Sequence, residues 1–149
     1  MNLEESIKQT KFKSEFHKLT LNIMFTAGNI NGEQTRFFKK YDISPQQYNV
    51  LRILRGQFPN PASVGLLQER MLDQMSNASR LVEKLKQKKL LTRKECKADR
   101  RQVDVIISGE GLKLLEEIDG LFDDFEKKHR TLNLDEAKEL NRLLDKINE

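Results

Sequence analysis

The residues best suited to chemistry lie in the stretch ECKADRRQVDVIISGEG, which runs from Glu95 to Gly111. Its second half alternates apolar side chains with the rest, as a β-strand with one buried face does. Two arginines, Arg100 and Arg101, stand directly after Asp99 at the entrance to this strand. Guanidinium groups stay charged and donate several hydrogen bonds in a planar fork. Two of them at the tip of a hairpin are therefore suited to binding anions such as phosphate groups.

A second polar set precedes this hairpin, in the segment QMSNASRLVEK. It combines short hydroxyl and amide side chains with two cations, and these types either hydrogen-bond to base edges or hold phosphates in DNA. The candidate residues of this set are Gln74, Ser76, Asn77, Ser79, Arg80 and Lys84.

The sequence contains no comparable set of residues that could carry out catalysis. The sequence shows no nucleophile paired with a base, no glycine-rich phosphate loop and no Cys/His cluster with zinc-ligand spacing, so we expect neither an enzyme nor a metal or cofactor site. The single cysteine, Cys96, excludes an intrachain disulfide and suits a reducing cytoplasm. No apolar run approaches the ~18 residues that a membrane span needs, so we expect a cytoplasmic protein without a membrane partner.

Charge is distributed unevenly along the chain. The net charge is +4, but residues 80–101 hold ten Lys/Arg against three Asp/Glu, whereas residues 109–149 hold seven against twelve. A basic middle and an acidic end predict two surfaces with different partners, and the basic one is suited to a polyanion.

The elements that must position these residues are mostly helices. With 149 residues the chain is long enough for one domain with a real core. An apolar stripe from Phe12 to Tyr41 predicts one long helix, part of which packs on another subunit. Ser44 and Pro45 predict the cap and first residue of a second helix, which should stop at Gly56.

The middle of the chain predicts two helices and then a hairpin. Ser63 is a good cap for a short helix over 63–72, and a turn at 73–75 leads into a helix over 75–89. The strands follow as TRKEC and QVDVIIS. Ser108 can cap a long helix, and Asn133 with Glu136 three residues later resembles the capping box of a last one.

This order is that of a winged helix-turn-helix. The fold class predicted is mainly α with a small β-hairpin wing and long N- and C-terminal dimerisation helices. The second helix of the motif would lie in the DNA major groove with its N-terminal residues at the base edges. The wing would reach the adjacent minor groove, which attracts inserted arginine. Asp99 would pair with Arg101 and hold its guanidinium extended, and Arg100 would be free for phosphate or groove contact.

At this point the sequence resembles the MarR-type transcriptional regulators over nearly its whole length. The matching stretches are ISPQQYNVLRIL, MSNASRLVEKLKQKKLLTR and DRRQVDVIISGEG. The resemblance implies dimerisation helices in 1–41 and 109–149 and a DNA-binding lobe in 42–108. It also implies a homodimeric repressor on a pseudo-palindromic double-stranded operator, relieved by a small-molecule signal whose binding residues are unknown. The wing residues carried over are Asp99, Arg100 and Arg101.

Two residues depart from the family pattern. Lys89 replaces the glycine that usually ends the recognition helix, and a non-glycine residue in a left-handed cap costs about 1 kcal/mol, so the helix end is expected to differ. Ser108 replaces the usual threonine and is followed by an extra glycine.

Three other interpretations stay open. Taken alone, the cations Arg80, Lys84, Lys86, Lys88 and Lys89 are more simply a solvated helix face. A winged helix can also serve protein–protein assembly instead of DNA binding. Cys96 has cations nearby that favour a thiolate, which allows a redox-responsive regulator, although an inert strand cysteine is the preferred interpretation.

Overall fold

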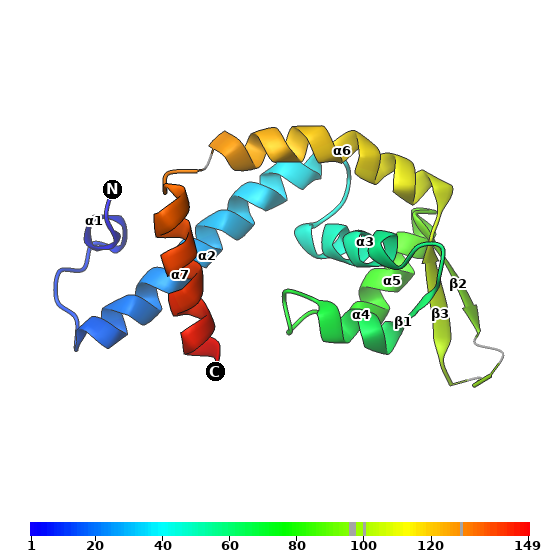
Figure 1. Ribbon diagram of the computed structural model, residues 1–149, viewed down its shortest axis with the longest axis horizontal. Coiled ribbons are helices and arrows are strands. Elements are labelled where there is room, and N and C mark those ends of the chain that lie inside the picture. The colour runs from blue at the N-terminus through cyan, green and yellow to red at the C-terminus, as the bar shows by residue number, and fades with distance from the viewer. Residues whose placement is uncertain (96–97, 100, 129) are drawn as a thin grey trace. The chain divides into compact units, whose positions relative to one another are not determined.

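The computed structural model describes residues 1–149 except Cys96, Lys97, Arg100 and His129, so the predictions for Cys96 and Arg100 lie outside the described residues. The chain forms two compact units, Met1–Gly111 and Leu112–Glu149, which are treated one at a time. Helices dominate and a small three-stranded antiparallel sheet accompanies them, which confirms the predicted fold class (Figure 1).

The N-terminal third contains two helices instead of the single one predicted. α1 spans Leu3–Ile7 and ends at Lys8, whose backbone is left-handed. α2 spans Glu15–Lys39, and the Ser14 side chain accepts a hydrogen bond from the backbone of His17. Phe12 therefore lies ahead of α2, because a serine cap restarts the helix after it. The two glycines inside α2 do not break it.

Local capping determines the next two helices as expected. α3 spans Pro45–Gln57, one residue beyond Gly56, and Ser44 forms a complete capping box with Gln47. α4 spans Val64–Arg70, and Ser63 accepts from the backbone of Leu66 at 3.0 Å. A side-chain oxygen that satisfies the first free N–H groups defines where each helix begins.

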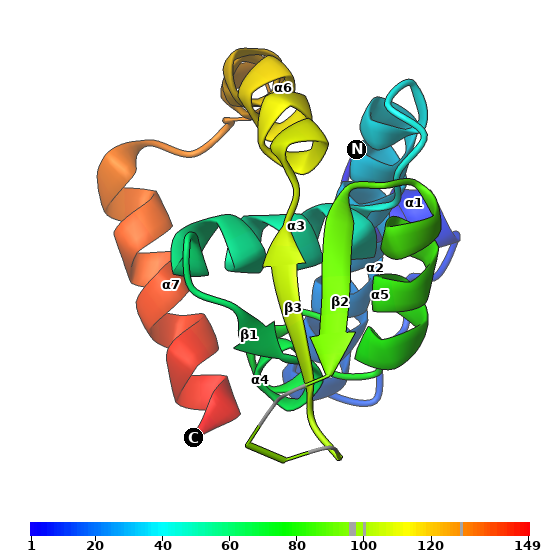
Figure 2. The same cartoon turned by 90° about the vertical axis from the view of Figure 1, so that its right-hand side faces the viewer.

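The sheet has the order β1–β3–β2 and is antiparallel throughout (Figure 2). β2 (Leu91–Glu95) and β3 (Val103–Ile107) form the predicted hairpin. β1 (Ala62–Ser63) was not predicted; it pairs with β3 through Ala62 opposite Val105. Two residues are too short to show an alternating pattern, so only the fold creates this strand.

α5 spans Ala78–Gln87 and begins three residues later than predicted. Asn77 is its cap and accepts a hydrogen bond from the backbone N–H of Arg80 at 3.0 Å. The predicted start at 75 was wrong because an asparagine cap competes successfully with Ser76 for the role. Consequently Gln74 and Ser76 belong to the turn ahead of the helix.

The end of α5 keeps the left-handed residue that glycine usually supplies. Lys89 has φ 61°, its N–H donates to the Lys86 carbonyl, and the Leu90 N–H donates to the Leu85 carbonyl. These two bonds form a Schellman motif. The expectation that the helix end would differ was wrong, because the hydrogen bonds and the burial of Leu91 hold Lys89 in this conformation despite its Cβ.

Replacing Lys89 with glycine is expected to raise the free energy of unfolding by about 1 kcal/mol relative to Lys89→Ala. Both variants lose the same charge, but only alanine retains the Cβ that strains a left-handed residue. Urea unfolding followed by circular dichroism measures the difference. Equal stability of the two variants would show that residue 89 is not left-handed in solution.

The core of the first unit lies between α3, α4, α5 and the sheet. Phe38, Leu51, Leu67 and Leu85 are fully or almost fully buried there, as are further residues of the three helices and two long strands: Val50, Leu54, Val82, Leu91 and Val105. Gly111 fits closely beside it, because a Cβ at this position would lie 2.3 Å from the Leu90 carbonyl oxygen. A larger residue there would collide with backbone.

α6 spans Gly109–Lys128, and Ser108 accepts from the Gly111 N–H at 3.0 Å, so the predicted cap is confirmed. α7 spans Leu134–Asn148 in the second unit, and Asn133 with Glu136 forms the predicted capping box. No residue of α7 is buried, although one face of this helix is apolar: Leu140, Leu143, Leu144 and Ile147.

Candidate nucleic-acid interface

α5 has one face in the core and one in solvent. Ala78, Val82 and Leu85 are buried. Ser79, Arg80 and Lys84 are exposed, so three of the six predicted residues lie on the solvent side of this helix. Arg80 and Lys84 are four residues apart and therefore lie on the same side of the helix, one turn from each other.

The turn before α5 is held by side-chain hydrogen bonds from neighbouring helices. Gln68 of α4 accepts from the Ala78 N–H at 3.0 Å, and Asn49 of α3 accepts from the Leu72 N–H at 2.9 Å. Asp73 accepts from the Met75 N–H at 3.0 Å. These bonds fix both the start of the helix and the path of the chain into it, so the exposed face of α5 has a defined orientation within this lobe.

Gln74, Ser76 and Asn77 are partly used by the fold itself. The Gln74 amide donates to the Met71 carbonyl. The Ser76 hydroxyl is buried and, within the described part of the chain, has no hydrogen-bond partner. Asn77 is exposed, but its oxygen caps α5. Of these three, Asn77 alone leaves an amide group at the surface with no described protein contact, so it is the one best placed for an external ligand.

At the wing, Asp99 orients its neighbour through the backbone. Its carboxylate accepts from the Arg101 N–H at 2.9 Å, and its carbonyl accepts from Gln102. The sequence predicted a contact with the guanidinium instead. An Asp side chain commonly accepts from the backbone N–H two residues ahead, and this bond closes a local turn here. Arg101 itself is exposed.

One hollow brings the wing and α5 together. Ser79 and Arg101 line the same surface depression of about 280 Å³, together with the start of α4. Its other lining residues are Ser63, Val64, Gly65, Gln102 and Val103. No sequence pattern indicated that Gly65 or Gln102 lies here, and Ser63 was predicted only as a helix cap. The hollow joins residues that lie more than twenty positions apart in the sequence.

An ion pair links the wing to α5. Arg93 of β2 contacts Glu83 of α5 at 3.1 Å, and both side chains are partly exposed. At the other end of the helix, Lys88 pairs with Asp42 at 3.6 Å and also donates to the Asp42 carbonyl. Both pairs are at least partly exposed, so each contributes little to stability.

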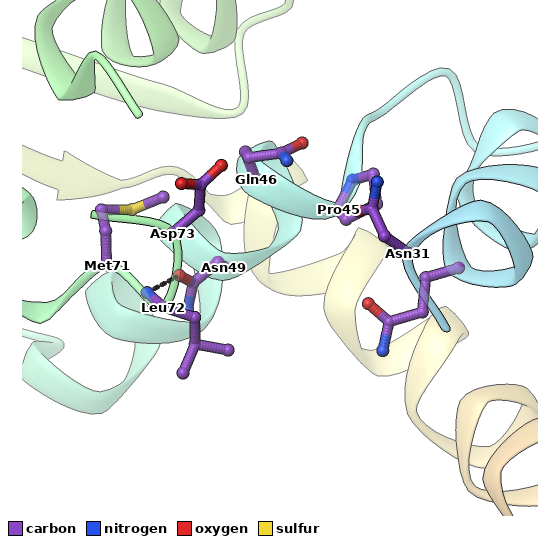
Figure 3. A pocket seen from close by; sticks show the side chains of 8 residues that line it. Asn31, Pro45, Gln46, Asn49, Met71, Leu72 and Asp73 are labelled. Carbon is purple, nitrogen blue, oxygen red and sulfur yellow. Dashed lines mark hydrogen bonds between the residues drawn. The ribbon is translucent and has the colours of Figure 1, made fainter. Parts of the chain in front are cut away.

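A second, smaller hollow of about 110 Å³ lies on another side of the same lobe (Figure 3). Asn31 and Gln34 of α2 line it together with the start of α3 and the turn after α4. Asn49 lines this hollow and also accepts the hydrogen bond from Leu72. A ligand here would therefore contact the residue that holds the turn before α5.

The described side chains of this surface are of types suited to binding an anion. Its described ionisable groups include the exposed cations Arg80, Lys84 and Lys86 of α5 and Arg101 of the wing, beside Asp99 and the paired Glu83. No group of three His, Cys, Asp or Glu side chains that could hold a metal ion occurs among the residues described. In the same part of the chain, no helix is long and apolar enough to cross a membrane.

Comparison with known proteins agrees with this arrangement. Residues 41–102 match the sequence model of the MarR family. The transcriptional regulator MgrA of Staphylococcus aureus is 27% identical over 139 residues, covering 90% of this chain and 92% of MgrA. A MarR-like regulator from Bacillus cereus has a TM-score of 0.80 at 22% identity, covering 90% of this chain and 96% of that one. A MarR variant from Escherichia coli, solved with operator DNA, has a TM-score of 0.77 at 20% identity, covering 93% and 99%.

The family model spans α3, α4, α5 and β2 and ends one residue before β3. The matches to MgrA in sequence and to the Bacillus cereus regulator in fold each extend over about nine-tenths of the chain. Over residues 41–102 this chain therefore matches the MarR family model, and over most of its length it is similar to the regulator MgrA and has the fold of MarR-type winged helix-turn-helix regulators.

Proposed function

We propose that this protein is a homodimeric, sequence-specific regulator that binds a pseudo-palindromic double-stranded operator and represses transcription. The observation that carries the proposal is the hollow shared by Ser79 of α5 and Arg101 of the wing. It joins the two elements that a winged helix uses on adjacent grooves. The exposed cations Arg80 and Lys84 lie on the solvent side of the same α5.

Each residue has a distinct task in this proposal. Asn77, Ser79 and Arg80, at the start of α5, contact base edges and flanking phosphates in the major groove. Lys84, one turn further on, neutralises a backbone phosphate. Arg101 enters the minor groove or contacts its phosphates, and Asp99 shapes the turn that presents it. Arg100 is proposed for the same groove on its sequence position alone, and Gln74 and Ser76 stay candidates with local roles.

A second copy of this chain is proposed to cover the apolar faces at both ends of the sequence. In α2, Phe16 is 81% exposed and Met24 is 65% exposed. In α7, Leu140, Leu143 and Ile147 are each exposed by 42% or more. Amphipathic helices with solvent-exposed apolar stripes are stabilised by burying them against a partner. These segments belong to the proposed dimerisation regions 1–41 and 109–149, and residues 42–108 are the proposed DNA-binding lobe.

Relief of repression is proposed to come from a small molecule in the hollow next to the turn before α5. Asn49 would exchange its bond to Leu72 for one to the ligand, and the start of α5 would lose a support. A ligand can shift the protein only if it prefers this altered arrangement. Because both half-sites must be met at once, at a spacing of about 34–36 Å, a small change in α5 lowers operator affinity.

Selection from a pool of random duplex DNA, repeated at two salt concentrations, tests the proposal. An enriched inverted repeat whose binding weakens steeply with salt is the expected result. Salt-sensitive binding without enrichment would contradict sequence specificity and leave an architectural role. Absence of binding at low salt would contradict DNA recognition, and the basic surface would then be assigned to protein–protein assembly.

A further inference from the structure

Two large apolar side chains lie exposed in the turn between α4 and α5. Leu72 is 88% exposed and Met75 is 93% exposed. Neither contributes to the core, and the turn that carries them is fixed by the hydrogen bonds of Asp73 and Asn49. The backbone therefore holds both side chains in water in a defined place, where an apolar group gains nothing by itself.

The two residues differ in what surrounds them. Leu72 lines the small hollow beside α2 and α3 (Figure 3). Met75 does not line that hollow; it lies two residues before Asn77, the cap of α5. The N-terminal end of a recognition helix faces the base edges of the major groove. Met75 is therefore the exposed apolar side chain that the proposed docking brings to the bases.

The major groove presents one apolar group, the C5-methyl of thymine. The side chains next to Met75 in the sequence that reach the surface are polar, namely Gln74 and Asn77, so they cannot recognise a methyl group by hydrogen bonding. A methionine has an unbranched, adaptable side chain that can follow the groove floor to such a group. A contact of this kind distinguishes thymine from cytosine and from uracil.

We propose that Met75 is a specificity-determining residue that recognises a thymine methyl group in each operator half-site. The proposal rests on the proposed function, because it needs the N-terminal end of α5 in the major groove. It adds an apolar contact to an interface otherwise composed of charged and polar groups, and it predicts thymine at one fixed position of each half-site.

The test replaces each thymine of the selected operator in turn with deoxyuridine, which removes only the methyl group. Wild-type protein is expected to lose about fourfold in affinity for each recognised methyl, and more when both half-sites are changed. Met75→Ala changes both protomers, so it should bind the normal operator as weakly as wild type binds the operator that carries deoxyuridine at that position in both half-sites. It should lose nothing further on that modified operator.

Leu72→Ala is the matched control, since it removes a comparably exposed apolar side chain from the same turn. It should retain the full thymine-to-uracil discrimination. Thermal unfolding of both variants by circular dichroism verifies that they are folded. The proposal would be overturned if the affinity losses from Met75→Ala and from deoxyuridine were additive, or if Met75→Ala discriminated thymine from uracil as well as wild type does. Salt-dependent operator binding would still support the proposed function in either case. Failure to select any operator would overturn both.

Discussion

Arg101→Ala is expected to lower operator affinity by about 100-fold at moderate salt. Each protomer of the proposed dimer contributes one Arg101, so one substitution removes two guanidinium contacts with the DNA. The dependence of log affinity on log salt concentration should also become shallower by about 2, because about one counterion fewer is released for each lost phosphate contact. Fluorescence anisotropy with a labelled operator at four salt concentrations measures both quantities.

Two further variants separate charge from position. Arg101→Lys keeps the charge without the planar fork, so it should restore most of the salt dependence and only part of the affinity. Arg130→Ala removes an exposed arginine that follows α6 and should change neither quantity by much. If Arg101→Ala kept wild-type affinity and the wild-type salt dependence, the wing would have no part in binding.

Introducing glutamate at Leu140 and Leu143 together is expected to convert the protein to a monomer. Both residues lie on the apolar face of α7, with 45% and 42% of their surfaces exposed, so the change adds charge to the proposed interface without emptying a core. Operator affinity should fall by about 100-fold or more, since the second half-site no longer benefits from linkage to the first. Sedimentation velocity and operator titration measure the two effects.

The matched control places glutamate at Asn141 and Asn148, which are also exposed on α7 but lie off its apolar face. This variant carries the same two added negative charges, and it should remain dimeric and bind the operator with nearly wild-type affinity. Helix content by circular dichroism verifies that α7 persists in both variants. If the Leu140 and Leu143 variant stayed dimeric with unchanged affinity, the apolar face of α7 would not be the dimer contact.

The sequence by itself determined those features that depend on a few neighbouring residues. The caps at Ser44, Ser63, Ser108 and Asn133 were predicted and occur, because each is a bond between a side chain and a backbone group within three residues. The hairpin and the overall order of helices followed from periodicity in the same way. The family resemblance rested on these features and on the wing motif, and the comparisons confirm it.

Only the tertiary structure decided how these pieces meet. It paired β1 with β3 and brought Gly111 close to the Leu90 carbonyl oxygen. The start of α5 at Ala78 and the Asp99 turn depend on local hydrogen bonds for which the sequence offered more than one candidate partner. The tertiary structure also brought Ser79 and Arg101 to one hollow. These contacts join residues that lie far apart in the sequence, or they select one of several neighbouring residues that could make nearly the same bond. The packing of the folded chain selects among them, and no local pattern in the sequence predicts the result.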